Sequence, residues 1–109
     1  MADHVEFNIR QMVPSQLGYK TLDGRQYDVW IRWLSDNKKW YIDLTLQSDP
    51  DVSIKGKALL QGKDILGPHG YKHMLGELWV EDTAGTFEDP TYEGMGDRWR
   101  LRYYPLETQ

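Results

Sequence analysis

Apolar and polar residues alternate along residues 26–46, with a polar break in the middle. The apolar positions are Tyr27, Val29, Ile31 and Trp33 before the break, and Trp40, Ile42, Leu44 and Leu46 after it. A period of two places such side chains on one face of an extended chain. Residues 35–39 between the two arms read Ser-Asp-Asn-Lys-Lys, a composition typical of a turn. The pattern predicts an antiparallel hairpin against which the weaker strands of the chain must pair.

The same alternation recurs in four shorter segments. It predicts strands over residues 4–10, 52–60, 76–82 and 98–104. Gly56 lies inside the second of these segments and predicts a bulge or a close approach of another backbone there. A short helix beginning at Ala58 is the alternative for the end of that segment, although Gly62 would break it after a turn or two.

Two stretches show no sustained period. Residues 11–24 contain Pro14, Gly18 and the turn Leu22-Asp23-Gly24, so we expect a connection with at most one short extended piece around Tyr19. Residues 83–97 are rich in glycine and acidic residues, which predicts a long loop.

These elements indicate an all-β fold. About six or seven short strands without a long amphipathic helix predict a small antiparallel barrel or sandwich with long loops. At 109 residues, the chain is expected to form a single domain over residues 1–109.

Composition and charge restrict the function further. The chain has no cysteine, which excludes disulfides, thiolate metal sites and a cysteine nucleophile. Its net charge of −4 argues against a nucleic-acid binder, because phosphate neutralisation needs a surplus of basic residues. It lacks both a run of apolar residues long enough to cross a bilayer and an export signal, so we expect no membrane partner and a soluble cytoplasmic protein.

The arginines of the last predicted strand form an outward row at positions 98, 100 and 102. Such a row can bind phosphate or carboxylate groups of a partner. If this strand pairs with residues 76–82, however, Glu77, Trp79 and Glu81 lie opposite the arginines. Cross-strand ion pairs and an arginine stacked on an indole would then occupy the row. We favour this surface ladder over a partner-binding patch.

No other group of residues predicts catalysis or metal binding. The acidic residues Glu81, Asp82, Glu88, Asp89, Glu93 and Asp97, and the pair Asp49 and Asp51, lack the spacing of a calcium loop and are interpreted as solvated charge. His69 and His73 lie four residues apart, but nearby glycines and Pro68 disfavour the helix that would bring them together. We therefore expect no enzyme, no cofactor and no metal.

The composition is unusual in its aromatic residues. Aromatic side chains make up 13% of the chain, with seven tyrosines and five tryptophans but only two phenylalanines. Trp30, Tyr41 and Trp79 fall on the outward faces of their predicted strands. They either pack in a second core, or lie exposed as a protein interface or as a platform that stacks on sugars.

The order of the motifs resembles that of the cyanophage-type baseplate plug family of contractile-tailed bacteriophages. The matching segments are Tyr27-Asp-Val-Trp-Ile-Arg-Trp33, Trp40-Tyr-Ile-Asp-Leu44, Gly56-Lys-Ala-Leu-Leu-Gln-Gly62-Lys-Asp-Ile-Leu66, Leu75-Gly-Glu-Leu78, Asp89-Pro90 with Gly94 and Gly96, and Leu101-Arg-Tyr103. The resemblance extends over nearly the whole chain beyond about Tyr19.

This resemblance implies a structural protein of the virion, without catalytic activity. It places the chain in the tail baseplate in multiple copies, assembled in the host cytoplasm and bound to hub, tube or spike proteins. It also implies that the protein helps to hold the state before contraction. The residues expected at the protein interface are Trp30, Tyr41, Trp79, Phe87, Tyr92, Arg98, Arg100 and Arg102. A carbohydrate-binding β-module is the main alternative, and an enzyme is the third.

Overall fold

The computed structural model describes residues 4–67 and 76–105. Its strands are β1 (Val5–Glu6), β2 (Ser15–Leu22), β3 (Arg25–Leu34), β4 (Lys39–Leu46), β5 (Ser53–Ala58), β6 (Glu77–Asp82) and β7 (Trp99–Tyr104). The described part of the chain contains no helix, and hence none that could cross a membrane. The prediction of an all-β fold is confirmed.

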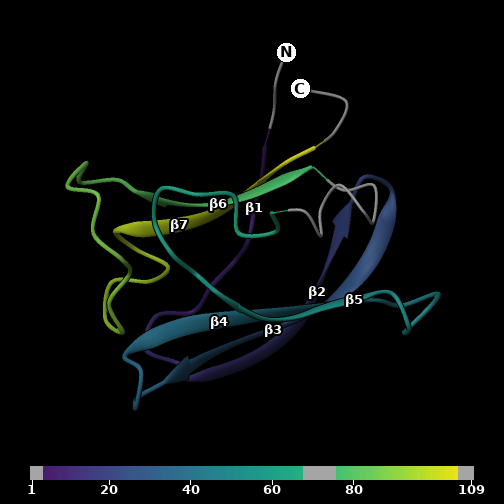
Figure 1. Ribbon diagram of the computed structural model, residues 1–109, viewed down its shortest axis with the longest axis horizontal. Helices are drawn as coiled ribbons and strands as arrows, with labels where there is room; N and C mark the ends of the chain where they lie inside the picture. The colour runs from purple at the N-terminus through teal and green to yellow at the C-terminus, as the bar shows by residue number, and fades with distance from the viewer. Residues whose placement is uncertain (1–3, 68–75, 106–109) are drawn as a thin grey trace.

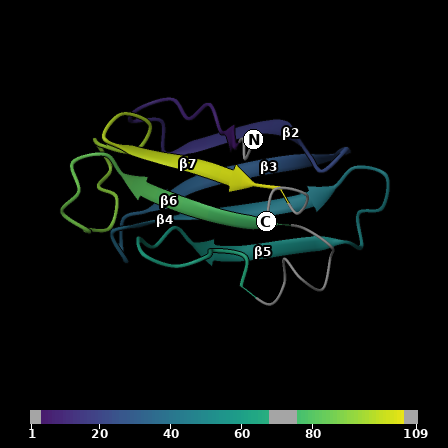
Figure 2. The same ribbon diagram turned by 90° about the horizontal axis from the view of Figure 1, so that it is seen from above.

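The strands form two antiparallel sheets that pack face to face (Figure 1). One sheet has the order β1-β7-β6 and the other the order β2-β3-β4-β5. From above, β6 and β7 lie over the four-stranded sheet (Figure 2). Beyond the ladders within each sheet, an isolated bridge between Gln61 and Val80 connects the segment after β5 to β6. Within the described residues the two sheets do not close on each other, so the architecture is a sandwich and the barrel alternative is not supported.

The central hairpin is confirmed by β3 and β4, which pair from Tyr27 opposite Leu46 to Leu34 opposite Lys39. The alternating apolar residues of both strands point between the sheets. Trp40 and Ile42 are fully buried there, in one hydrophobic core with Leu78 and Leu101 of the other layer. One face of both strands is buried against the other sheet, which explains why the apolar residues recur so regularly at every second position in the sequence.

The prediction of a connection over residues 11–24 was wrong. Residues 15–22 form β2, which pairs with β3 along its whole length. The turn between them consists of Asp23 and Gly24, whose φ angles of 52° and 79° suit a tight two-residue hairpin. Leu17 and Tyr19 point outward, and Leu22 at the end of the strand is its only buried apolar residue, so most of the inward side of β2 lacks apolar side chains.

The predicted strand over residues 4–10 is much shorter in the structure. Only Val5 and Glu6 pair with β7, and the Phe7 N–H donates the last hydrogen bond, to the Leu101 carbonyl oxygen, at 3.0 Å. The chain then leaves the sheet because it crosses to β2, while Phe7 stays buried and Ile9 packs against the core.

The bulge predicted at Gly56 is present in β5. The register shifts between Ile42 and Leu44, so that Lys55 and Gly56 together face Asp43. Gly56 has φ 69°, and its N–H donates to Asp43 Oδ1 at 2.7 Å. The alternative of a helix beginning at Ala58 was wrong.

Candidate functional site

The outer face of the three-stranded sheet carries the predicted ladder of charged residues. Arg102 Nη1 donates to Glu81 Oε1 at 2.9 Å, across the β6–β7 pair. Arg100 Nη1 and Arg102 Nε donate to the two carboxylate oxygens of Glu6 on β1, at 2.9 and 3.1 Å. Sequence reasoning missed Glu6 because it lies more than ninety residues before its partners. The arginine row is thus neutralised within the molecule.

Arg98 anchors the start of the long loop. Its Nε and Nη2 atoms donate to both oxygens of Asp82, at 2.8 and 2.9 Å, while Asp82 also accepts hydrogen bonds from Thr86 and Ala84. The Arg98 guanidinium, together with these donors, holds the pKa of Asp82 well below its usual range. The bonds from Arg102 and Arg100 likewise lower the pKa of Glu6.

The stacks of arginine on tryptophan differ from the prediction. Among the described residues they join Arg98 to Trp99 and Arg32 to Trp30, each with the guanidinium carbon 4.2 Å from the ring centre. Trp79 is half-buried, and its Nε1 donates to Glu77 Oε1 at 3.0 Å. The ladder places Trp79 next to Arg102, but this arginine is turned toward carboxylates.

Tyr92 anchors the loop over residues 83–97 to the hairpin. Its ring is stacked on Trp40 with centroids 5.8 Å apart, and its hydroxyl donates to the Met12 carbonyl oxygen at 2.7 Å. Trp40 Nε1 in turn donates to the Thr91 carbonyl oxygen at 2.9 Å. The ring is half-buried, so Tyr92 stabilises the fold and offers little free surface.

The outer face of the four-stranded sheet is different, because apolar side chains lie exposed on it. We define the Trp30 face as the outward side chains Leu17, Tyr19 and Trp30 with the hollow beside them. Leu17 is 77% exposed, Tyr19 69% and Trp30 39%. Leu17 lies directly opposite Trp30 in the β2–β3 ladder.

Trp30 is fixed in position on this face. Its Nε1 donates to Ser15 Oγ at 3.0 Å, and the guanidinium of Arg32 covers part of the ring. Arg32 is held by Asp43, which also caps the bulge in β5. An open hollow of about 450 Å³ lies beside the ring, between β2 and the bulge. An ordered aromatic ring beside a hollow, with a rim of charged residues, is the arrangement of an interface anchor.

The structure divides the predicted interface residues between different surfaces. Trp30 and Tyr41 share the outer face of the four-stranded sheet, although Tyr41 is half-buried and its hydroxyl accepts a hydrogen bond from Asn37 at 2.8 Å. Trp79 and the arginines lie on the opposite outer face. Phe87 protrudes from the long loop, 76% exposed and with φ 59°. Sequence reasoning missed Leu17 and Tyr19 as surface residues, because it expected a connection where β2 lies.

No cluster of histidine and acidic residues that could hold a metal occurs in the described ranges 4–67 and 76–105. His69 and His73 lie outside those ranges. Of the loop carboxylates, Asp89 caps the Gln61 N–H at 3.0 Å and lies 3.8 Å from the Lys39 ammonium nitrogen.

Comparison with known proteins agrees with this structural picture. A search of curated proteins found no match to the chain. The family model described as cyanophage baseplate Pam3 plug gp18 matches residues 5–106, which include every strand of both sheets. The chain therefore belongs to the cyanophage baseplate plug family and is a structural protein of the phage tail baseplate.

Proposed function

We propose that this baseplate protein is an assembly subunit, without catalytic activity, that binds neighbouring tail proteins through the Trp30 face. The supporting observation is the contrast between the two outer faces of the sandwich. Charged residues on the three-stranded sheet pair with one another, whereas Leu17, Tyr19 and Trp30 on the four-stranded sheet expose apolar surface. Exposed apolar surface with a charged rim is typical of a protein-binding site.

We propose hub, tube or spike proteins of the tail as the neighbours, in an assembly with several copies of the chain that forms in the host cytoplasm. In this role the protein helps to hold the baseplate before contraction and yields when the baseplate rearranges. The small number of exposed apolar side chains on the Trp30 face supports such a role. A few anchors with a charged rim can hold a partner firmly, yet separate when neighbouring subunits move.

Replacing Trp30 tests this proposal. Trp30→Ala removes the central anchor and should weaken capture of tail proteins from phage-infected cells by roughly 30-fold, as a loss of about 2 kcal/mol implies. Trp79→Ala is the matched control, because it removes the same side chain from the opposite outer face. If Trp79→Ala abolished capture while Trp30→Ala did not, the interface would lie on the three-stranded sheet, which would contradict our proposal.

A sugar titration tests the alternative of a carbohydrate-binding module. Trp30 is the exposed tryptophan on this face, so an oligosaccharide bound there would quench its fluorescence in a saturable way. We expect no such quenching. Saturable quenching that Trp30→Ala removes would contradict the assembly role of this face.

A further inference from the structure

β2 is an edge strand with a free side. It pairs with β3 on one side, and it ends the strand order of its sheet among the described residues. The Trp33 N–H donates to the Pro14 carbonyl oxygen at 2.8 Å. In the β2–β3 register, this bond shows that the even-numbered residues of β2 direct their main-chain groups toward β3. The main-chain groups of Leu17, Tyr19 and Thr21 therefore point away from β3. They offer hydrogen bonds to another strand.

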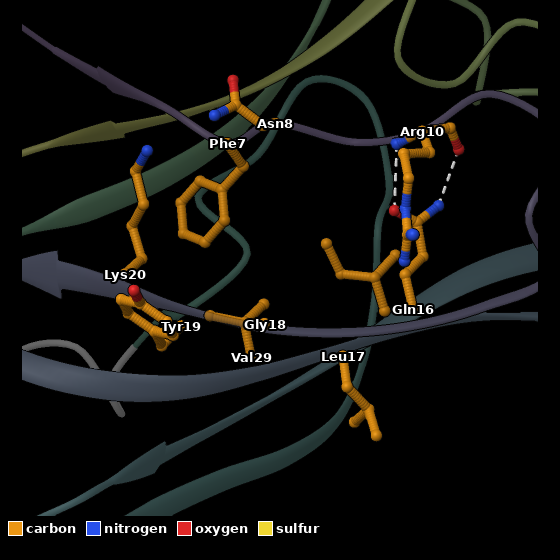
Figure 3. A pocket seen from close by; sticks show the side chains of 10 residues that line it. Phe7, Asn8, Arg10, Gln16, Leu17, Gly18, Tyr19, Lys20 and Val29 are labelled. Atoms are coloured by element: carbon orange, nitrogen blue, oxygen red, sulfur yellow. Dashed lines mark hydrogen bonds between the residues drawn. The ribbon is translucent and has the colours of Figure 1, made fainter.

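A groove of about 330 Å³ runs beside this free edge, between the two layers (Figure 3). Phe7 lies on one side of it, and β2 with the inner side chain of Val29 lies on the other. Gly18 has no side chain to fill the groove, and the space above it is empty, since a Cβ atom at this position would meet no atom within 4 Å. The inward side chains of a strand added to β2 would enter this space.

The charged side chains that line the groove are both basic. Lys20 extends upward from β2 toward Phe7, and Arg10 lies near the other end (Figure 3). Neither of these two residues forms an ion pair with the described part of the chain. By contrast, the arginines at positions 32, 98, 100 and 102 are all paired with carboxylates.

We propose that the free edge of β2 accepts an extended acidic segment of a neighbouring baseplate protein as an additional strand. This inference rests on the proposed assembly role. The segment forms main-chain hydrogen bonds with Leu17, Tyr19 and Thr21, as in other cases of strand addition. It places a small apolar side chain over Gly18 and carboxylates beside Lys20 and Arg10.

The charge of the groove makes the choice of partner selective. An inward-pointing lysine on an edge strand disfavours unselective pairing, since a buried ammonium group needs a partner. A second copy of this chain would bring its own Arg10 and Lys20 to the same edge, so self-pairing is disfavoured by like charge. The Gln16 side chain, bonded to the main chain of Arg10, keeps one end of the groove in shape.

A synthetic peptide tests the proposal directly. The sequence Thr-Glu-Thr-Val-Thr-Glu-Thr reads the same in both directions, and so presents valine between two inward glutamates in a parallel or an antiparallel strand. Added at millimolar concentration to the ¹⁵N-labelled protein, it should shift the amide signals of Leu17, Tyr19 and Thr21. The peptide with lysine in place of both glutamates should not. Equal shifts with both peptides, shifts confined to other strands or no shifts at all would overturn the proposal.

Two variants of β2 show whether the peptide binds in the groove or on the Trp30 face. Gly18→Val fills the groove and should abolish the response to the peptide, whereas Thr21→Val adds valine on the outer side of the same strand and should retain it. The amide spectrum of each variant without peptide shows whether it is folded. A full response in folded Gly18→Val contradicts the groove site, as does a dimer of the wild-type protein formed through β2.

The same variants distinguish failure of this inference from failure of the assembly role. Gly18→Val should reduce incorporation of the protein into virions several-fold relative to Thr21→Val. Normal incorporation of folded Gly18→Val would contradict the strand site and leave the assembly role intact. Absence of the wild-type protein from virions would contradict the assembly role itself.

Discussion

Gln16 is a buried polar residue whose side chain acts as a substitute for a peptide group. Its Oε1 accepts a hydrogen bond from the Arg10 N–H at 2.9 Å, and its Nε2 donates to the carbonyl oxygens of Arg10 and Val13 at 2.7 and 3.1 Å. The segment that crosses from β1 to β2 thus satisfies its main chain without forming a strand. The Gln16 side chain thus stabilises the path by which the chain leaves the three-stranded sheet after β1.

Replacing Gln16 should therefore destabilise the fold. Gln16→Leu has a similar size but leaves the main-chain groups of Arg10 and Val13 without these partners, at a cost of about 1–2 kcal/mol in the free energy of unfolding. Urea denaturation measures this loss. Gln26→Leu, on the exposed side of β3, is the control and should change the stability by less than about 0.5 kcal/mol. Equal effects of both variants would contradict the role assigned to Gln16.

Asp82 should make the stability of the folded protein depend on pH in the acidic range, below the ordinary pKa of 3.8. Its pKa in the folded protein lies below the ordinary value of 3.8, because Arg98, Thr86 and Ala84 donate hydrogen bonds to the carboxylate. The folded state favours the ionised form, so the contribution of Asp82 is fully present above its unfolded pKa and is lost as the pH falls through its folded pKa.

Comparison with Asp82→Asn isolates this contribution. The variant should be less stable than the wild-type protein at pH 7, and the difference should narrow as the pH falls below the ordinary pKa of 3.8. Urea denaturation of both proteins at a series of pH values measures the difference. A difference that stays constant down to the lowest pH would show that Asp82 does not titrate with a lowered pKa.

The strands differ in how far the sequence could predict them. The hairpin of β3 and β4 was predictable because its inner face is apolar at every second position. The alternation in β2 is reversed over most of the strand, with Gln16, Gly18 and Lys20 inward and Leu17 and Tyr19 outward. Leu22 is its only inward apolar residue. The usual rule that apolar residues point inward fails for an edge strand that exposes them. The two-residue turn at Asp23 and Gly24 was the signal that could have identified it.

The bulge in β5 provides a test at the level of one strand. Gly56 has φ 69°, whereas Gly18 in β2 lies outside the left-handed region, and a Cβ atom at either position would meet no atom within 4 Å. Gly56→Ala should therefore cost about 1–2 kcal/mol of stability through backbone strain alone. Gly18→Ala is the matched control and should be neutral or stabilising by up to about 1 kcal/mol. Equal loss in both variants, measured by urea denaturation, would contradict this account of the bulge.

The whole molecule presents two outer faces with different properties. Pairing among Glu6, Glu81, Arg100 and Arg102 covers the three-stranded sheet with neutralised charge, while the four-stranded sheet exposes the Trp30 face. The order of motifs along the chain was sufficient to predict the family, because it reflects the order of strands. It did not distinguish the two faces, since Trp30 and Trp79 look alike in the sequence and differ only in the neighbours that the fold brings to them.

The composition of purified virions tests the central claim most directly. If the protein is a structural subunit of the baseplate, quantitative mass spectrometry should find it in intact particles at a fixed ratio to other tail proteins. It should also remain with isolated baseplates after the capsid and tube are removed. Absence of the protein from purified virions, while it is abundant in the infected cell, would contradict the account.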